Sequence, residues 1–332
     1  DPWNGRRDLE SGILRHVSPA FAEDPLRVLR GMQLAARFGF DGAPETLALC
    51  RSIEPEGLAR ERIFDEWKKL ILAGRQISRG MRFLRASGWL VHFPELAALV
   101  HCPQDPEWHP EGDVWTHTAH VLDAFAEHRL GDATEDLVVG LACLCHDFGK
   151  PATTHFVDGR WRSPNHEAIG DPPTRAFLGR MTDQRDLIEA IVPLVREHLK
   201  PIQLYAAGSG PAAIRRLARR VGRIDRLVRV CRADHAGRPP LSGDFPAGDW
   251  LLDRATTLRL EAEAPKPIVQ GRHLIELGLK PGRHFGPILE ACFEAQLDGA
   301  FDDLDRGLHH AARILAETDP ANTESVTRAD EY

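Results

Sequence analysis

The stretch Leu137 to Lys150, LVVGLACLCHDFGK, decides how the fold of this chain is interpreted. Its first nine residues carry no charge and almost no polarity, and His146 and Asp147 follow them directly. Such a run is buried either as a helix or as a strand, and periodicity alone does not separate the two. Because ionisable groups at the edge of a dry core need a partner or a metal, the pair is either a hydrogen-bonded cap or part of a metal site.

The rest of the chain has helical periodicity almost throughout, which predicts an all-α fold. Residues 1–17 are the exception: they predict a loop followed by a short strand-like ILRHV, a β remnant at the edge of a missing domain. Segments 101–113 and 151–164 are expected to be loops, and the polar tail after Asp319 is expected to fray. The other helices are expected at about 23–38, 60–73, 76–87, 94–101, 114–127, 165–181, 184–199, 211–234, 248–263, 271–277, 284–298 and 302–316.

The composition, with 42% hydrophobic and 27% charged residues, is that of a soluble globular protein. No apolar run approaches the roughly 20 residues that span a bilayer, and the opening DPWNGRRDLE is no signal peptide, so we expect no membrane association. The chain also lacks an initiator Met, which predicts a fragment or a processed product. Six cysteines without a CxxC pair fit a reducing cytoplasm, the expected location. A net charge of −7 argues against broad coating of nucleic acid, although local patches decide that question.

Further side chains that can bind a metal lie at inward or helix-end positions. His198 continues the apolar stripe of 184–199, and Asp234 follows the inward Cys231 by three residues. Each alone could be a satisfied core or cap residue, but six on five separate helices indicate a common centre. Mixed imidazole and carboxylate ligands suit Mg, Mn, Ni, Co, Fe or Zn, and such an ion activates water and polarises a phosphoryl oxygen. The six candidates are His117, His146, Asp147, His166, His198 and Asp234; His101, His109 and His120 are weaker, as loop or supporting residues.

The succession of His117, then His146-Asp147, then a distant Asp234 resembles the HD superfamily of metal-dependent phosphohydrolases. The resemblance implies that these residues hold a divalent metal. It also implies catalytic roles for the three residues that match further family positions. His166 and His198 would bind a second metal or the phosphate, and Lys150 would stabilise developing charge.

The N-terminal segments DPWNGRRDLESGILRHV and FAEDPLRVLRGMQLAARFGF closely resemble the class II bacterial tRNA nucleotidyltransferase and poly(A) polymerase family, the CCA-adding enzymes. The family's Glu-Asp-x-x-Arg motif implies that Asp24 and Arg27, with Arg30 following, bind CTP or ATP. An acceptor and a fork of donors on one helical face can mimic a base edge. Without the flanking matches, an N-terminal cap with an i,i+3 salt bridge would explain the motif instead.

The resemblance covers nearly the whole chain and implies four parts. These are the end of the nucleotidyltransferase head (1–17), a neck for base recognition and RNA binding (18–90), the HD phosphohydrolase (91–240) and a helical tail that binds tRNA (241–332). The family's transfer carboxylates lie in a Gly-Gly…Asp-x-Asp head upstream of the first residue here, so we expect no nucleotide addition by this chain alone. Gln33 also departs from the family, in which many members have Arg at this neck position.

Between Ile214 and Arg238 the chain has nine arginines and two acids, which predicts either phosphate contacts or a face balanced by acidic neighbours. The turn at 280–284, KPGRH, is a weaker candidate for contact with RNA backbone. The expected partners are therefore nucleotides and either tRNA or another RNA 3′ end. A homodimer is compatible with the sequence.

The expected function is that of the C-terminal part of a tRNA nucleotidyltransferase with a metal-dependent phosphohydrolase. Its substrate would be a 2′,3′-cyclic phosphate, a 2′-nucleotide or a similar phosphoester at an RNA end. Two alternatives stay open. One is a non-enzymatic RNA-binding fragment with a structural metal, and the other is a standalone HD hydrolase of free nucleotides.

Overall fold

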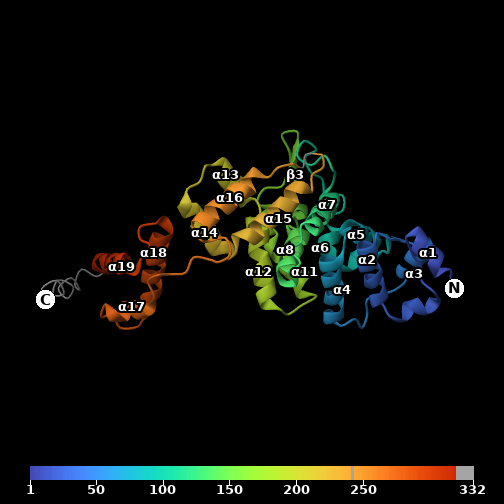
Figure 1. The fold of residues 1–332 in the computed structure, drawn as a ribbon, viewed down its shortest axis with the longest axis horizontal. Coiled ribbons are helices and arrows are strands. Elements are labelled where there is room, and N and C mark those ends of the chain that lie inside the picture. Colours follow the sequence, from blue (N-terminus) through green and yellow to red (C-terminus); the bar gives the residue numbers. More distant parts are fainter. Residues whose placement is uncertain (241–242, 319–332) are drawn as a thin grey trace. The chain divides into compact units, whose positions relative to one another are not determined.

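The computed structural model of the chain consists mostly of helices, so the all-α prediction is confirmed (Figure 1). It describes residues 1–240 and 243–318, and the tail after Asp319 that was expected to fray lies outside them. The α-helices are α1 (Gly5–Ser11), α2 (Leu26–Phe38), α3 (Pro44–Cys50), α4 (Arg60–Ala73), α5 (Ile77–Ala86), α6 (Pro94–Ala97), α7 (Val114–Glu127), α8 (Ala133–Cys145), α9 (Lys150–Thr153), α10 (His166–Ile169), α11 (Asp171–Gly179), α12 (Arg185–Glu197), α13 (Lys200–Ala206), α14 (Pro211–Val221), α15 (Ile224–Ala236), α16 (Pro246–Thr257), α17 (Gly271–Glu276), α18 (Phe285–Asp298) and α19 (Leu304–Thr318). Two 3₁₀ turns, η1 (Pro19–Glu23) and η2 (Trp89–His92), accompany them.

The chain forms two compact units. The first contains residues 1–206 and 225–252, and the second contains 207–224 and the chain from 253 onward. In the first unit, α8 packs against α4, α7 and α12 (Figure 1). In the second, α18 packs against α14 and α19, over a core that includes Leu274 and Cys292.

Helix α8 contains the apolar run that was ambiguous in the sequence. Asp132 caps its N-terminus by accepting hydrogen bonds from the backbone N–H groups of Thr134 and Glu135. Every residue from Leu137 to Cys145 is buried, because neighbouring helices surround α8. At Gly140 a Cβ would lie 2.4 Å from Ile71 Cγ2, so the close approach of α4 requires glycine there. The run is therefore a central buried helix that ends at Cys145, directly before His146.

Two segments expected to be loops contain regular structure. Residues Gly5–Ser11 form α1, whose first N–H groups at Gly5 and Arg6 donate to the Asp1 carboxylate. Segment 151–164 contains the antiparallel hairpin of β3 (His155–Val157) and β4 (Arg160–Arg162). Its two-residue Asp158-Gly159 turn has positive φ at both positions, as tight hairpins require, so the signal was present in the sequence.

The strand expected in ILRHV is present as β1 (Ile13–Leu14), which pairs in parallel with the later β2 (Asp41–Gly42). The partner strand thus comes from this chain. Among the described residues, none of the helices has the length and apolarity needed to cross a bilayer.

The prediction of a single helix over 211–234 is wrong. Helix α14 ends at Val221, because Gly222 adopts φ +74°, and α15 begins at Ile224. The two helices belong to different compact units. The expected helices 94–101 and 248–263 are shorter, ending at Ala97 and Thr257, and 165–181 is divided into α10 and α11.

The arginines of α14 and α15 mostly face carboxylates, which favours the alternative of a balanced face. In the second unit, Arg219 lies 2.8 Å from Glu290 and 2.7 Å from Glu294. In the first unit, Arg226 lies 2.7 Å from Glu135. Three further arginines are paired in the same way: Arg216 with Glu294 and Asp298, Arg229 with Asp136, and Arg232 with Asp249.

Candidate metal centre

The six residues expected to bind a metal converge at the ends and inner faces of five helices of the first unit. Asp147 and His146 directly follow α8, and His198 directly follows α12. All six are buried, with exposed fractions of 8% or less. They are His117 on α7, His146 and Asp147 after α8, His166 at the start of α10, His198 after α12 and Asp234 on α15.

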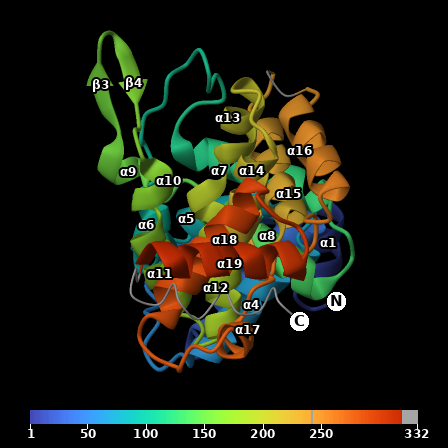
Figure 2. The same cartoon turned by 90° about the vertical axis from the view of Figure 1, so that its left-hand side faces the viewer.

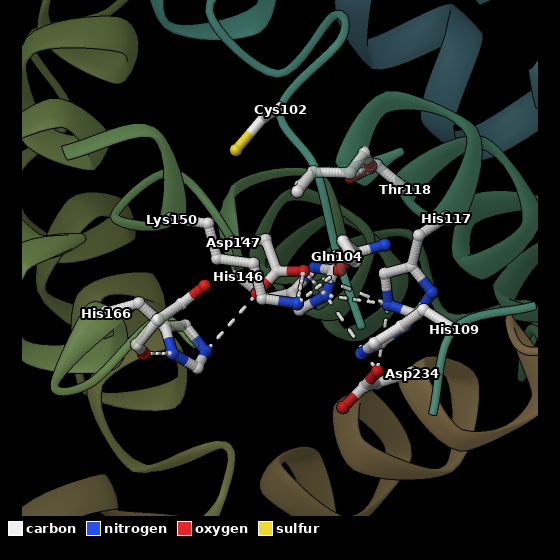
Figure 3. Close-up of polar contacts among 12 residues, drawn as sticks. Cys102, Gln104, His109, His117, Thr118, His146, Asp147, Lys150, His166 and Asp234 are labelled. Atoms are coloured by element: carbon white, nitrogen blue, oxygen red, sulfur yellow. Dashed lines mark hydrogen bonds and ion pairs between the residues drawn. The ribbon is translucent and has the colours of Figure 1, made fainter. Parts of the chain in front are cut away.

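One half of the centre joins His117, His146 and Asp234. His117 Nε2 lies 3.0 Å from Asp234 Oδ1 and 3.4 Å from His146 Nε2. His146 Nε2 is in turn 3.2 Å from Asp147 Oδ2 (Figure 3). His117, His146 and Asp147 thus place their ligand atoms within 4.8 Å of one another, as a metal site requires.

The other half joins Asp147 to His166 and His198. His166 Nε2 lies 3.3 Å from Asp147 Oδ1 and 3.3 Å from His198 Nε2. Asp147 therefore bridges two clusters with its two carboxylate oxygens, and Figure 3 shows it between His166 on one side and His117 on the other.

Backbone carbonyls set the tautomer of three of these rings. The Nδ1 atoms of His146, His166 and His198 lie 2.7 to 2.8 Å from backbone carbonyl oxygens. Because a carbonyl only accepts, each Nδ1 donates its proton, and the lone pair is on Nε2, which faces the centre. Metal-binding histidines in proteins are oriented by such outer hydrogen bonds.

The charge balance also fits a cation. Asp147 is buried and its carboxylate is ion-paired with the Lys150 ammonium, but neither of its oxygens has a contact with hydrogen-bond geometry among the described residues. Burial opposes ionisation, but His146 and Lys150 outweigh it and hold the pKa of Asp147 well below its usual range. Burial, with His166 and His146 nearby, lowers the pKa of His198 to about 3. At neutral pH the centre thus offers an ionised carboxylate and an unprotonated imidazole, the forms that bind metals.

Lys150, expected to be catalytic, lies at this centre. Its Nζ is 2.8 Å from Asp147 Oδ2 and donates to Gln104 Oε1 at 2.7 Å. The intervening Gly149 explains the HDFGK sequence, because a Cβ there would lie 1.9 Å from the His166 carbonyl oxygen. Glycine thus permits the backbone after Asp147 to approach α10, which begins with His166.

Sequence reasoning missed Glu111, whose side chain is fully buried beside the centre. Its Oε1 lies 2.8 Å from Nδ1 of both His109 and His117. Burial opposes ionisation, but these hydrogen bonds outweigh it and lower the pKa of Glu111 to about 2. His109, expected only as a loop or supporting residue, packs edge-on against His117 with ring centres 4.8 Å apart. Glu111 lies in an irregular segment, so no periodicity points to it.

An open cavity of about 260 Å³ leads to the centre. Asp147, Lys150, His166, His198 and Asp234 contribute to its wall. The other lining residues are Gln104, Asp105, Trp108, His109, Trp161, Ser163, Leu199, Ile202 and Arg238. The cavity therefore combines carboxylates, imidazoles and cations with exposed aromatic rings.

The residues expected to bind a nucleotide base lie around the start of α2, in a different arrangement. Asp24 precedes the helix in extended conformation and accepts a hydrogen bond from the Leu26 N–H, so the expected shared helical face with Arg27 is wrong. Asp24 pairs with Arg62 at 3.0 Å, which only the tertiary fold reveals. The Arg27 guanidinium donates to the Ala20 carbonyl, and Arg30, half-exposed, lies 3.7 Å from Glu66.

Comparison with known proteins identifies the family. The model described as "HD domain" matches residues 114–230, and the model "Probable RNA and SrmB- binding site of polymerase A" matches residues 39–99. The multifunctional CCA protein of Alkalilimnicola ehrlichii is 38% identical over 293 residues, which are 84% of this chain and 67% of that protein. The chain belongs to the family of multifunctional CCA proteins. Its HD match includes His117, His146, Asp147, His166 and His198.

Other family members and solved structures agree. The multifunctional CCA proteins of Laribacter hongkongensis and Xylella fastidiosa (strain M12) are 39% and 40% identical, over 72% and 76% of this chain. The chain spans 59% and 62% of the length of these two relatives. Its fold is similar to a CCA-adding enzyme solved with CTP, with a TM-score of 0.52, 18% identity and coverage of 94% of this chain and 65% of that one. A CCA-adding enzyme solved with ATP gives a TM-score of 0.51 at 18% identity, over 97% and 67% of the two chains.

Proposed function

We propose that the HD centre of this chain is a metal-dependent phosphohydrolase acting on phosphoesters of RNA ends or nucleotides. A 2′,3′-cyclic phosphodiester, a 2′-phosphate or a similar monoester is the expected substrate. The observation that carries this proposal is the convergence of Nε2 atoms on the buried carboxylate of Asp147: those of His146 and His166 lie 3.2 and 3.3 Å from its oxygens, and that of His117 lies 3.9 Å away. Buried groups of this kind are satisfied by a cation.

His117, His146, Asp147 and Asp234 would hold the cation, and their mixed imidazole and carboxylate donors do not single out one divalent metal. When bound, it would activate water and polarise a phosphoryl oxygen.

The other residues of the cavity bind and orient the substrate. Lys150 directs an ammonium group at the carboxylate of Asp147 and lines the open cavity, where it offsets the charge of a phosphate. His166 and His198 contribute a second pair of Nε2 atoms that binds either the phosphate or a second cation. Arg238 adds a cationic group to the same wall.

The family membership supports a wider proposal for the protein. The chain would act in tRNA 3′-end processing in the cytoplasm, with tRNA bound by its helical parts and CTP or ATP bound near Asp24, Arg27 and Arg30. The matched RNA-binding model over residues 39–99 supports the tRNA contact. We propose further that the whole protein adds nucleotides and forms a homodimer. The parts of this chain would meet at residues 17, 90 and 240.

The proposal is tested by replacing both His146 and Asp147 with Ala and measuring hydrolysis of 2′,3′-cyclic AMP with added Mn²⁺ or Ni²⁺. The wild type should turn over and the double variant should not. His128→Ala, which removes an exposed histidine at the end of α7, is the matched control and should keep full activity. Equal turnover by the double variant and the wild type would exclude the centre as the site of hydrolysis. Metal binding by the wild type without hydrolysis of any phosphoester would support a structural metal instead.

A further inference from the structure

Two exposed tryptophans, Trp108 and Trp161, line the cavity of the metal centre, and the exposed Phe156 packs against Trp161. Trp108 is 57% exposed, Phe156 59% and Trp161 36%. Exposing aromatic rings to water costs free energy unless the rings have a ligand or partner. The described core accommodates other tryptophans fully, for example Trp67 and Trp89. Lack of space in the core therefore does not explain why these rings are exposed.

Two of the rings form a pair on the β3–β4 hairpin. Phe156 and Trp161 are directly opposite in the antiparallel register, so they share one face of the hairpin. Their ring centres are 5.1 Å apart at a steep angle. A two-stranded hairpin is only marginally stable by itself, and this one stands out from the helices of its unit (Figure 2).

The third ring is brought to the hairpin by an ion pair. Arg160 of β4 pairs with Glu107, the neighbour of Trp108, and its Nε lies 4.0 Å from Asp105. This contact joins the hairpin to the irregular segment before α7. The loop that carries Trp108 and the strand that carries Trp161 are thus held together.

Trp108 and Trp161 line the same cavity as the metal centre. Its wall also contains the cationic side chains of Lys150 and Arg238. A phosphate attracted to these cations and to the centre would leave the rest of its molecule beside the two indole rings. The arrangement of a charged floor and an aromatic rim matches a nucleotide, in which a phosphate and a flat base are joined by a sugar.

We propose that Trp108, Trp161 and Phe156 form a stacking platform for the nucleobase next to the phosphoester that the centre hydrolyses. This inference rests on the proposed function. It adds that the site recognises the nucleoside part of the substrate. Stacking on an aromatic face tolerates every base, because each base has a π-face. The platform therefore selects nucleotides over other phosphoesters without selecting one base.

The test compares a nucleotide with a phosphodiester that has no base. Trp161→Ala should raise KM for 2′,3′-cyclic AMP about tenfold, with a much smaller effect on kcat. It should lose far less activity on glycerol 1,2-cyclic phosphate. Trp161→Phe, which keeps a ring, should restore most of the affinity, and Trp161→Leu should not. Trp3→Ala is the control. It removes another exposed tryptophan, which precedes α1 and is 60% exposed, and it should behave as wild type.

Equal losses on both substrates, or no change on either, would overturn the platform. Calorimetric measurement of 2′,3′-cyclic AMP binding to Mn²⁺-loaded protein distinguishes failure of the platform from failure of the hydrolase proposal. If the wild type binds this nucleotide without hydrolysing it and Trp161→Ala binds more weakly, the platform stands and the proposed reaction falls. If wild type and Trp161→Ala bind it equally, or neither binds it, the platform falls whatever the activity.

Discussion

His166 Nε2 and His198 Nε2 lie 3.3 Å apart with no proton between them, because each ring donates its single N–H to a backbone carbonyl on the opposite side. Two imidazole lone pairs at this distance repel each other. A shared cation, or a group bonded to one, removes the repulsion, and Asp147 Oδ1, 3.3 Å from His166, supplies the compensating charge. The rings are thus preorganised for a ligand by the ends of α10 and α12.

Replacing Gly149 with Ala should damage this preorganisation. The added Cβ would meet the His166 carbonyl oxygen at 1.9 Å and the Gly170 nitrogen at 2.7 Å, and both are backbone atoms. We expect a loss of about 3 kcal/mol in unfolding free energy, together with weaker Mn²⁺ binding as His166 is displaced. Urea unfolding and calorimetric titration measure the two effects. Gly179→Ala, where a Cβ meets open space, is the control, and a similar loss in both variants would contradict this account of Gly149.

Removing the Glu111 carboxylate should weaken metal binding although Glu111 lies behind His117. Its Oε1 accepts from His117 Nδ1 at 2.8 Å and so directs Nε2 at the centre. For Glu111→Ala we expect an affinity for Mn²⁺ about 10- to 100-fold lower. Glu111→Gln, which keeps an acceptor oxygen, should lose less. Wild-type affinity in Glu111→Ala would show that the Gly237 carbonyl, 3.2 Å from Nδ1, is enough to orient the ring.

Asp113 should contribute stability that disappears in acid. Its carboxylate caps α7, which carries His117, by accepting hydrogen bonds from Thr116 N–H and hydroxyl and from His101 N–H. Burial opposes ionisation, but these hydrogen bonds outweigh it and lower the pKa of Asp113 in the folded state. The contribution is therefore complete above the unfolded pKa of about 3.9 and is lost as the pH falls through the lower, folded pKa.

Two substitutions at Asp113 separate charge from capping. Asp113→Ala should lose about 1 kcal/mol of unfolding free energy at pH 7, and the difference from wild type should shrink below pH 4. Asp113→Asn keeps an acceptor and should lose less at pH 7. Chemical denaturation across this pH range checks both, and a difference between wild type and Asp113→Ala that is independent of pH would contradict the role of the ionised cap.

The sequence predicted which helical side chains point inward, because burial of a helix face follows a short-range period. His198 and Asp234 were placed by the stripes of their own helices, and both are buried at the centre. Contacts between segments remote in the chain left no such trace. Asp24 pairs with Arg62, 38 residues away. Glu111 is only six residues from His117, but it lies in an irregular segment without a period that could place it.

Other differences come from local signals that periodicity ignores. Gly222 ends α14 by adopting φ +74°, although the apolar stripe continues across it into α15. The Asp158-Gly159 turn forms the β3–β4 hairpin within a segment too short and polar to be read as strands. Which arginines face carboxylates also depends on packing between helices, so the sequence left both alternatives open.

The metal dependence of turnover tests the central claim most directly. After treatment with EDTA and removal of the chelator, wild-type protein should hydrolyse 2′,3′-cyclic AMP only when Mn²⁺ or another divalent ion is added back, with saturation at increasing metal concentration. Asp147→Asn, which keeps the size of the side chain and removes its charge, should not recover at any metal concentration. Turnover by the wild type that needs no added metal, or full recovery of Asp147→Asn, would contradict a hydrolytic metal centre at His146 and Asp147.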